Sequence, residues 1–299
     1  MNSGILLVDK PQGITSHDVV ARVRKAAGTR KVGHAGTLDP LATGLLVLGL
    51  DSSTRLLTFL VGLYKTYEAT IRLGLSTASD DSEGEVTATA DASGVSDAAV
   101  DAGIADLTGP ISQVPTTVSA IKVGGRRAYD LAREGVEVEL KARDVVVSEF
   151  VVLDRRDTVV DGVAVRDLDV RVSCSSGTYV RALARDLGGA LGVGGHLTAL
   201  RRTRVGSFDV ADAAVLEGIE VAPALLAPSA VASSLFPVWS MTADEAVDLG
   251  HGKRPTTGRA DTEGPVAAVT DSGDLAGLVS VRGGRAVPIV NFPTDEVRA

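Results

Sequence analysis

The feature that most restricts the fold of this chain is the changing period of its hydrophobic pattern over the first 75 residues. An apolar run at 4–9 (GILLVD) is typical of a buried strand, whereas apolar residues between Val19 and Ala27 recur with helical spacing. From Tyr67 to Leu75 apolar and polar residues alternate strictly, which predicts a half-buried strand. Because strand and helix patterns follow one another without an internal repeat, the sequence predicts an α+β fold.

Local signals place the boundaries of further elements. Thr15 and Asp18 match a capping box that would begin the first helix, and Gly28 would end it. Thr178 is the expected cap of a second long helix. The polar, acidic stretch 76–94 is expected to be a loop or a sheet edge. Other elements are expected as a helix at 97–107 and strands at 45–50, 145–153 and 163–173.

The C-terminal part of the sequence is expected to form a separate small unit. Residues 222–237 are rich in Ala, Pro and Ser, which is typical of a linker. Thr242 and Glu245 form another capping box and predict one short helix. Short strands separated by Gly-containing turns are expected at 265–270, 275–282 and 286–291. We therefore expect a larger domain at 1–235 and a small β-rich domain at 238–299.

The charge distribution bears on the choice of partner. The whole chain has a formal net charge of -8, which argues against a polyanionic partner. Residues 1–60 and 166–209, however, each carry seven Lys or Arg against four Asp or Glu. Acidic residues concentrate in 61–110 and 210–299 instead. An acidic protein can still present a basic face to nucleic acid, so charge alone leaves RNA binding open.

Hydropathy and cysteine content indicate the compartment. No uncharged apolar run approaches about 18 residues, so no transmembrane helix and no membrane contact are expected. The start of the chain has no basic segment before its short apolar run, so no signal peptide is expected. The single cysteine, Cys174, excludes an internal disulfide, and the four histidines show no metal-ligand spacing. We expect a cytoplasmic protein without a structural metal.

Asp39 is the one carboxylate in the stretch 33–50, GHAGTLDPLATGLLVLGL. An aspartate before a proline is a common helix start, so Asp39 and Pro40 are interpreted as a cap and a first helical residue. The alternative is a functional site, because a Gly-rich loop also presents His34 and an apolar strand follows directly. A carboxylate at the edge of a core needs a partner. The residues alone leave both interpretations open.

Three further residues have both a structural and a functional interpretation. Arg181 would lie in the first turn of its helix, where the helix dipole disfavours a cation unless a carboxylate or a phosphate compensates. A solvated surface arginine is the alternative. Tyr67 and Tyr179 are either core residues or parts of a site. Motifs of serine hydrolases, P-loop proteins, dinucleotide-binding proteins and zinc peptidases are missing from the sequence, so the residues alone name no reaction.

Several successive motifs carry a resemblance to a known family. In chain order they are LLVDKPQGITSHDVV, GHAGTLDPLATGLLVLGL, KTYEATIRLG, CSSGTYVRALARDLG and GGHLTALRRTRVGSF. Together they resemble the motifs of TruB-type tRNA pseudouridine synthases, in the same order and at similar spacing, over residues 4–209. The basic segment at about 110–145 resembles the family's inserted thumb, which grips RNA. The last 60 residues loosely resemble a PUA-type RNA-binding domain.

The resemblance implies a fold and an activity. The fold would be that of pseudouridine synthases, with a large mixed, mainly antiparallel sheet flanked by helices and interrupted by the thumb. The activity would be isomerisation of uridine 55 in the T-loop of tRNA. The N1–C1′ bond breaks, the uracil rotates, and C5 bonds to C1′ without a cofactor or metal. The implied partner is the T-arm of tRNA, bound by a monomer.

The resemblance also implies residue roles. Asp39 would be the catalytic aspartate, Tyr67 would stack on the base and help move the C5 proton, and Arg181 would pair with the carboxylate. The residues implied in substrate binding are His34, Tyr179 and Leu200 in the pocket, and Lys122, Arg126 and Arg127 in the thumb. One departure is Val118, which stands before Ser119-Ala120-Ile121-Lys122 where the family often has an aromatic residue.

Other functions remain to be weighed against this one. A guide-RNA-dependent pseudouridine synthase is a first alternative, against which the short termini and the lack of basic tails argue. A non-catalytic tRNA-folding chaperone on the same scaffold is a second. A glycosidase would need a second carboxylate near Asp39, and residues 10–50 offer only Asp18. Whether Asp39 would attack C1′ or take the C2′ proton is also open.

Overall fold

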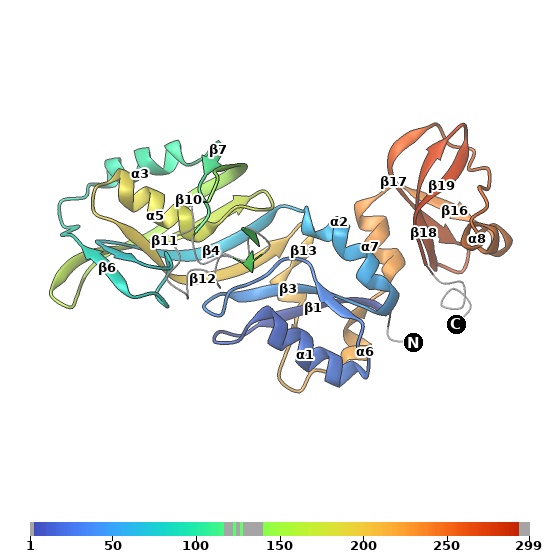
Figure 1. Cartoon of the computed structure of the whole chain (residues 1–299), viewed down its shortest axis with the longest axis horizontal. Coiled ribbons are helices and arrows are strands. Elements are labelled where there is room, and N and C mark those ends of the chain that lie inside the picture. The colour runs from blue at the N-terminus through green and yellow to red at the C-terminus, as the bar shows by residue number, and fades with distance from the viewer. Residues whose placement is uncertain (1–2, 117–121, 124–125, 128–139, 293–299) are drawn as a thin grey trace.

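The computed structural model describes residues 3–116, 122–123, 126–127 and 140–292. The described residues form a large mixed sheet of eleven strands (Figure 1). Its main order is β14 (Ala214–Val215), β1 (Gly4–Lys10), β3 (Thr43–Leu50), β12 (Gly195–Val205), β4 (Lys65–Leu73), β11 (Val163–Cys174), β10 (Arg143–Val160) and β7 (Gly109–Gln113). Only the β1–β14 and β3–β12 pairs of this path are parallel. The predicted α+β fold with a large, mainly antiparallel sheet is confirmed.

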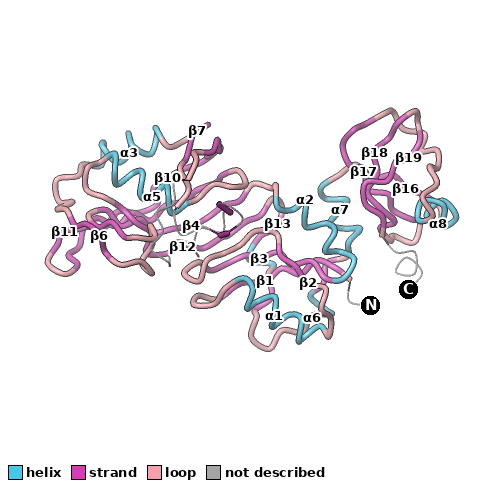
Figure 2. The backbone as a smooth tube through the Cα atoms, in the orientation of Figure 1, coloured by secondary structure: helices cyan, strands magenta, loops and turns pink. Residues whose placement is uncertain are grey.

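Helices pack near both ends of this sheet (Figure 2). They are α1 (Ser16–Ala27), α2 (Leu57–Val61), α3 (Asp97–Asp106), α5 (Val180–Ala190) and α6 (Val221–Ala224), together with the short 3₁₀ helices η1 (Asp51–Leu56) and η2 (Val210–Asp212). Helix α5 lies against β4 and β12. Its apolar side chains Val180, Leu183, Ala184 and Leu187 form a stripe that is buried there. Burial of such a stripe is what holds an amphipathic helix on a sheet.

The boundaries of α1 follow its predicted signals. The Thr15 side chain accepts a hydrogen bond from Asp18 N, and the Asp18 carboxylate accepts one from Thr15 N, which completes the capping box. Gly28 ends the helix with a φ of 67°, a left-handed conformation that glycine adopts at little cost. Val19 and Val23 are buried on the core side of the helix. Local sequence therefore determines where this helix starts and stops.

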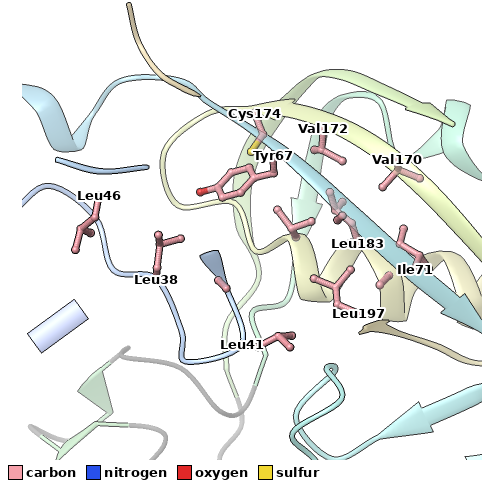
Figure 3. Packing of buried hydrophobic residues seen from close by; sticks show 14 of the residues in the cluster. Leu38, Leu41, Leu46, Tyr67, Ile71, Val170, Val172, Cys174, Leu183 and Leu197 are labelled. Atoms are coloured by element: carbon pink, nitrogen blue, oxygen red, sulfur yellow. The ribbon is translucent and has the colours of Figure 1, made fainter. Parts of the chain in front are cut away.

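In strand β4 the apolar residues of the alternating pattern face the core. Tyr67, Ala69, Ile71 and Leu73 are buried, whereas Glu68 between them is exposed. Figure 3 shows Tyr67 and Ile71 among apolar side chains of β11, α5 and β12. Those labelled neighbours are Val170, Val172, Cys174, Leu183 and Leu197. The half-buried strand predicted here is confirmed.

Strands β10 and β11 form a longer hairpin than the pattern predicted. β10 was expected to end near residue 153 but runs on to a turn at Asp161 and Gly162, which have φ values of 50° and 81°. A two-residue turn with positive φ suits an Asp-Gly hairpin. Cross-strand ion pairs such as Arg166–Asp157, 2.7 Å apart, support the polar end of the hairpin. The prediction of β10 was based on the spacing of apolar residues, so it missed the end of the strand, where the paired residues are polar.

The prediction that residues 222–237 form a linker is wrong. This stretch contains β15 (Leu225–Leu226) and α7 (Pro228–Leu235) after α6. Leu225 pairs with Leu6 of β1, and Val231 and Ala232 of α7 are buried. Small side chains let α7 approach the sheet closely, so the Ala- and Ser-rich composition marks tight packing here rather than an unstructured connection.

The C-terminal part folds as a four-stranded sheet with one helix. Its elements are β16 (Val238–Met241), α8 (Ala243–Gly250), β17 (Thr262–Thr270), β18 (Leu275–Arg282) and β19 (Arg285–Asn291). The capping box at Thr242 and the three later strands match the prediction, whereas the first strand, parallel to β17, was not predicted. Leu275 and Leu278 share a buried cluster with Ile5 and Leu7 of β1. Val231 and Ala232 of α7 (Pro228–Leu235) belong to the same cluster, and α7 contacts both β1 and β18, so the small sheet joins the larger one through this helix.

Two short hairpins complete the described chain. Within the acidic stretch, β5 (Leu75–Thr77) pairs with β6 (Val86–Thr89). In the basic segment, β8 (Lys122–Val123) pairs with β9 (Arg126–Arg127). Val118 and its neighbours to Ile121 lie outside the described residues. No helix among the described residues is long and apolar enough to cross a membrane.

Candidate active site

Asp39 lies in the loop that joins β2 (Val32–His34) to β3. No helix begins at Asp39 within this part of the described chain, so its interpretation as a helix cap is wrong. The Asp39 carbonyl accepts a hydrogen bond from Ala42 N, 3.1 Å away, in a short turn that leads directly into β3. Its side chain is 42% exposed. The carboxylate thus stands at the edge of the core with one side open.

The loop that carries Asp39 is fastened to the start of the chain. Ser16 Oγ contacts both main-chain polar groups of Leu38, accepting from its N at 2.8 Å and donating to its O at 3.0 Å. Gly13 N donates to Pro40 O at 2.8 Å. Lys10 Nζ donates to Ile14 O at 2.7 Å, and burial lowers the pKa of Lys10 to about 8. Hydrogen bonds therefore join the first two motifs of the sequence to each other around Asp39.

Arg181 forms the ion pair that its sequence position suggested. Its Nη2 lies 2.8 Å from Asp39 Oδ2, and its side chain is only 6% exposed. It also contacts Asp81 Oδ2 through Nη1 at 3.2 Å and donates to Ser79 O at 2.8 Å. Arg181 lies in the first turn of α5, as predicted, but Thr178 is not the N-cap of this helix. Two carboxylates compensate the unfavourable helix dipole at this cation.

Tyr179, rather than Thr178, is the residue at the N-cap of α5. Thr178 Oγ1 donates instead to Ser175 O at 3.0 Å, within the preceding turn. The Tyr179 side chain makes no capping hydrogen bond in the helix. The predicted cap is therefore wrong by one residue. The Thr178 hydroxyl is not available to cap α5, because it bonds within the turn between β11 and α5.

Asp81 is a site residue that sequence reasoning missed. Its side chain is 4% exposed and accepts hydrogen bonds from Ser79 Oγ and from Glu83 N, in addition to its contact with Arg181. The acidic stretch 76–94 was expected to be a loop or a sheet edge, and nothing local distinguishes Asp81 from its neighbours. The second carboxylate that a glycosidase would need is thus present near Asp39, but it is buried and occupied by donors.

A cavity of about 260 Å³ opens beside the ion pair. Its walls include Asp39, Tyr67, Tyr179, Arg181 and Leu200. These residues come from the β2–β3 loop, β4, the start of α5 and β12, so four separate segments meet here. The structure therefore brings five of the six predicted pocket residues together at one site.

The sixth residue, His34, is not among the residues that line this cavity. It ends β2, five residues before Asp39, and its ring meets the ring of His17 edge-on with centroids 5.7 Å apart. Burial lowers the pKa of His34 below its usual value of 6.5, and His17 and Arg202 lower it further. His34 is therefore a neutral ring near the site at pH 7.

Two cations to which the sequence analysis gave no role, Lys65 and Arg202, also line the cavity. Arg202 is 1% exposed and donates to the carbonyl oxygens of Leu45 and Gly36, at 2.8 and 3.0 Å. Burial raises the pKa of Tyr67, and a hydrogen bond from Arg202 partly opposes this. Burial also lowers the pKa of Lys65 to about 8, with Arg202 as a second cause. Both cations lie inside the quoted motifs, but the motifs alone assigned them no role.

Lys65 is expected to make the free energy of unfolding increase with pH in the alkaline range. Its pKa is about 8 in the folded protein and near 10.5 in the unfolded chain, so between these values the unfolded chain binds more protons. Stability therefore rises with pH above about 8, by on the order of 1–2 kcal/mol. Urea unfolding at pH 7.5, 8.5 and 9.5 should show a smaller rise for Lys65→Met. Equal slopes for both proteins would contradict this assignment.

The three thumb residues cannot be assigned contacts. Lys122 starts β8, and Arg126 and Arg127 form β9, but their side chains lie outside the described part of the chain. Within that part, no three His, Cys, Asp or Glu side chains gather as a potential metal site. The expectation of a reaction without metal or cofactor stays a prediction.

Comparisons with known proteins agree with this arrangement. The model described as TruB family pseudouridylate synthase (N terminal domain) matches residues 24–180. The chain belongs to this family. Two C-terminal models of TruB proteins match residues 181–238 and 236–293, so the TruB matches continue over the small sheet.

Individual relatives support the TruB assignment along the whole chain. A protein of Leifsonia xyli subsp. xyli named tRNA pseudouridine synthase B is 57% identical, with 99% of both chains covered. One of Thermobifida fusca with the same name is 53% identical over 98% of this chain and 99% of its own.

Solved structures show the same fold. An H/ACA RNP bound to a substrate RNA containing 2′-deoxyuridine contains a chain with a TM-score of 0.71 and 24% identity, covering 98% of this chain and 86% of that one. The archaeal box H/ACA sRNP Nop10–Cbf5 complex gives a TM-score of 0.70 at 24% identity, with coverages of 98% and 88%. At this identity the likeness concerns the fold alone.

Proposed function

We propose that this protein isomerises uridine 55 in the T-loop of tRNA to pseudouridine. The observation that carries the proposal is the Asp39–Arg181 ion pair, 2.8 Å apart, at the wall of a cavity that also contains Tyr67. The TruB relatives named tRNA pseudouridine synthase B support the substrate. The reaction conserves all atoms of the nucleoside: N1–C1′ breaks, C5–C1′ forms, and the C5 proton is exchanged for one on N1.

The proposed reaction begins with a base outside its stack. A uridine in a folded loop must be extruded before its sugar can reach a carboxylate on the enzyme. Asp39 then acts at C1′ as a nucleophile or takes the proton from C2′ as a base. Both routes need an ionised carboxylate, and the Arg181 guanidinium, 2.8 Å away, balances its charge and holds it in place. The open side of Asp39 admits the sugar.

Tyr67 is proposed to hold the uracil within the cavity. Because burial raises its pKa, its phenol is neutral at pH 7 and offers a face for stacking and a hydroxyl for hydrogen bonding. We propose that Tyr179 and Leu200 enclose the base from α5 and β12, since both line the cavity. His34 is proposed to keep the base out of its stack from beside the site.

Larger parts of the molecule are proposed to bind the rest of the tRNA. Residues 110–145 would grip the T-arm as a thumb, and 238–299 would act as a PUA-like RNA-binding domain behind a catalytic domain at 1–235. Support for the second comes from the four-stranded sheet and the family model at 236–293. We further propose that the protein acts as a cytoplasmic monomer.

The test is tritium release from C5 of labelled uridines in an unmodified tRNA transcript, without cofactor or guide RNA. Stoichiometric release from one mapped T-loop uridine is the expected result. If folded protein binds the transcript but releases no tritium, the proposal is wrong. A chaperone would then still accelerate tRNA folding, whereas a guide-dependent enzyme would gain activity when a guide RNA is added.

Replacing Lys122, Arg126 and Arg127 together with Ala should weaken tRNA binding and flatten its salt dependence. If each side chain neutralises one phosphate, the slope of log K against log salt falls by about 2–3. Binding is measured by filter retention between 50 and 200 mM salt, after circular dichroism has verified the fold. Unchanged affinity and slope would remove the thumb assignment.

A further inference from the structure

The Asp39–Arg181 ion pair is held from both sides by buried side chains outside the cavity. Gln113, at the end of β7, is 2% exposed, and Ser16, at the start of α1, is fully buried. Neither side chain is among those lining the cavity. Each one bonds to both the N–H and the C=O of a single residue in the segment that carries one partner of the ion pair.

The Gln113 carboxamide makes the contact on the Arg181 side. Its Oε1 accepts from Tyr179 N at 2.8 Å, and its Nε2 donates to Tyr179 O at 3.1 Å. Tyr179 is the N-cap residue of α5, so its N–H has no partner within the helix, whereas its C=O also accepts from Leu183 N at 3.2 Å. Gln113 therefore fixes the position from which Tyr179 and Arg181 project.

A second contact ties the same two elements together. Arg185, one turn after Arg181 on α5, donates through Nη2 to Val114 O at 2.7 Å and pairs through Nη1 with Asp80 at 3.1 Å. The end of β7 is thus bonded to α5 at two levels. A small shift of this strand end would be transmitted to the start of the helix.

Ser16 makes the equivalent contact on the Asp39 side. Its hydroxyl serves Leu38 N and Leu38 O, at 2.8 and 3.0 Å, directly before the catalytic loop reaches Asp39. Leu38 is itself 3% exposed, so without Ser16 its polar groups would be buried without these partners.

We infer that Gln113 and Ser16 are positioning residues for the Asp39–Arg181 pair, one for each partner. This inference rests on the proposed function, because its measure is the rate of that reaction. Displacing a catalytic group by about 1 Å costs up to about 100-fold in rate while leaving binding little changed. Gln113 lies at the edge of the proposed thumb, but both side chains are buried and bonded to main-chain groups. Neither is therefore expected to contact RNA, and KM should stay constant.

The first test uses Gln113→Met, which keeps the side-chain length but cannot hydrogen-bond. Single-turnover tritium release should fall about 10–100-fold at saturating tRNA, with affinity within threefold of wild type. Ser16→Ala should show the same fall in rate, again with affinity within threefold of wild type. Ser53→Ala is the matched control, since Ser53 is also fully buried but bonds to Ser3. The control should keep full activity.

The second test separates positioning from a general loss of structure. In an Arg181→Lys background, adding Gln113→Met should lower the single-turnover rate by less than a further threefold. The reason is that Gln113 acts through the Arg181 guanidinium, which this background lacks. Fully additive losses, or rates within twofold of wild type for both single variants, would overturn the inference. If Gln113→Met does not fold, Gln113→Glu, which keeps the acceptor for Tyr179 N, is compared in the same cycle. Inactive wild-type protein would instead contradict the proposed function.

Discussion

Asp39→Asn is expected to release no detectable tritium from the labelled tRNA transcript, a loss of at least about 10⁴-fold, while binding the tRNA within about threefold of wild type. An amide of the same shape is neutral, so it neither attacks C1′ nor takes the C2′ proton. The fold should survive, because Asp39 caps no helix in the described chain and its side chain is 42% exposed. Arg181 also keeps Asp81 as a partner.

The control for this variant is Asp212→Asn, an exposed aspartate in η2 that does not line the cavity. It should keep full activity and full binding. Tritium release, filter binding and thermal unfolding are measured on the same preparations. If Asp39→Asn retains activity within tenfold of wild type, Asp39 is not the catalyst. If it loses binding together with activity, the loss does not identify a chemical role.

Arg181→Met is expected to damage both catalysis and stability. The rate should fall by about 10²–10³, because the carboxylate of Asp39 loses the cation that orients it and balances its charge. The free energy of unfolding should fall by about 3–5 kcal/mol, because Asp81 keeps a buried charge without its partner. Urea unfolding and single-turnover tritium release measure the two effects separately.

A double variant separates the two effects of Arg181. In Arg181→Met with Asp81→Asn, the uncompensated buried charge is gone, so much of the lost stability should return. Activity should not return, since Asp39 still lacks its guanidinium. A double variant that regains both would show that Arg181 supports the fold rather than the reaction. A single variant as stable as wild type would contradict the structural role of the Asp81 contact.

Elements governed by local rules were predictable from the sequence. The first helix starts at the Thr15 box and ends at Gly28, and β4 alternates as predicted, because capping and side-chain period depend on neighbours only a few residues away. Where partners lie far apart, prediction failed. The linker expected at 222–237 is wrong, because Leu225 pairs with β1 and α7 buries Val231 and Ala232. β10 is longer than expected, because ion pairs join its far end to β11.

The candidate site shows the same division. Asp39, Tyr67 and Arg181 were singled out in the sequence through a lone acid, a rare aromatic residue and a cation in a first helical turn, together with a family resemblance. Asp81 and Arg202 were missed, since neither differs in its local sequence from a solvated residue. Their importance arises only from burial beside Arg181 and Tyr67, and burial is a property of the folded chain.

The sequence by itself determined the α+β class, the capped helices and the family. The residues alone left Asp39 open between a helix cap and a functional loop residue, and the structure showed the loop. The tertiary structure alone decided which charges meet: Arg181 is shared between Asp39 and Asp81, which are 42 residues apart in the chain. The physical reason is range, since backbone propensities act over one or two turns, whereas ion pairs and burial depend on contacts that the sheet brings together.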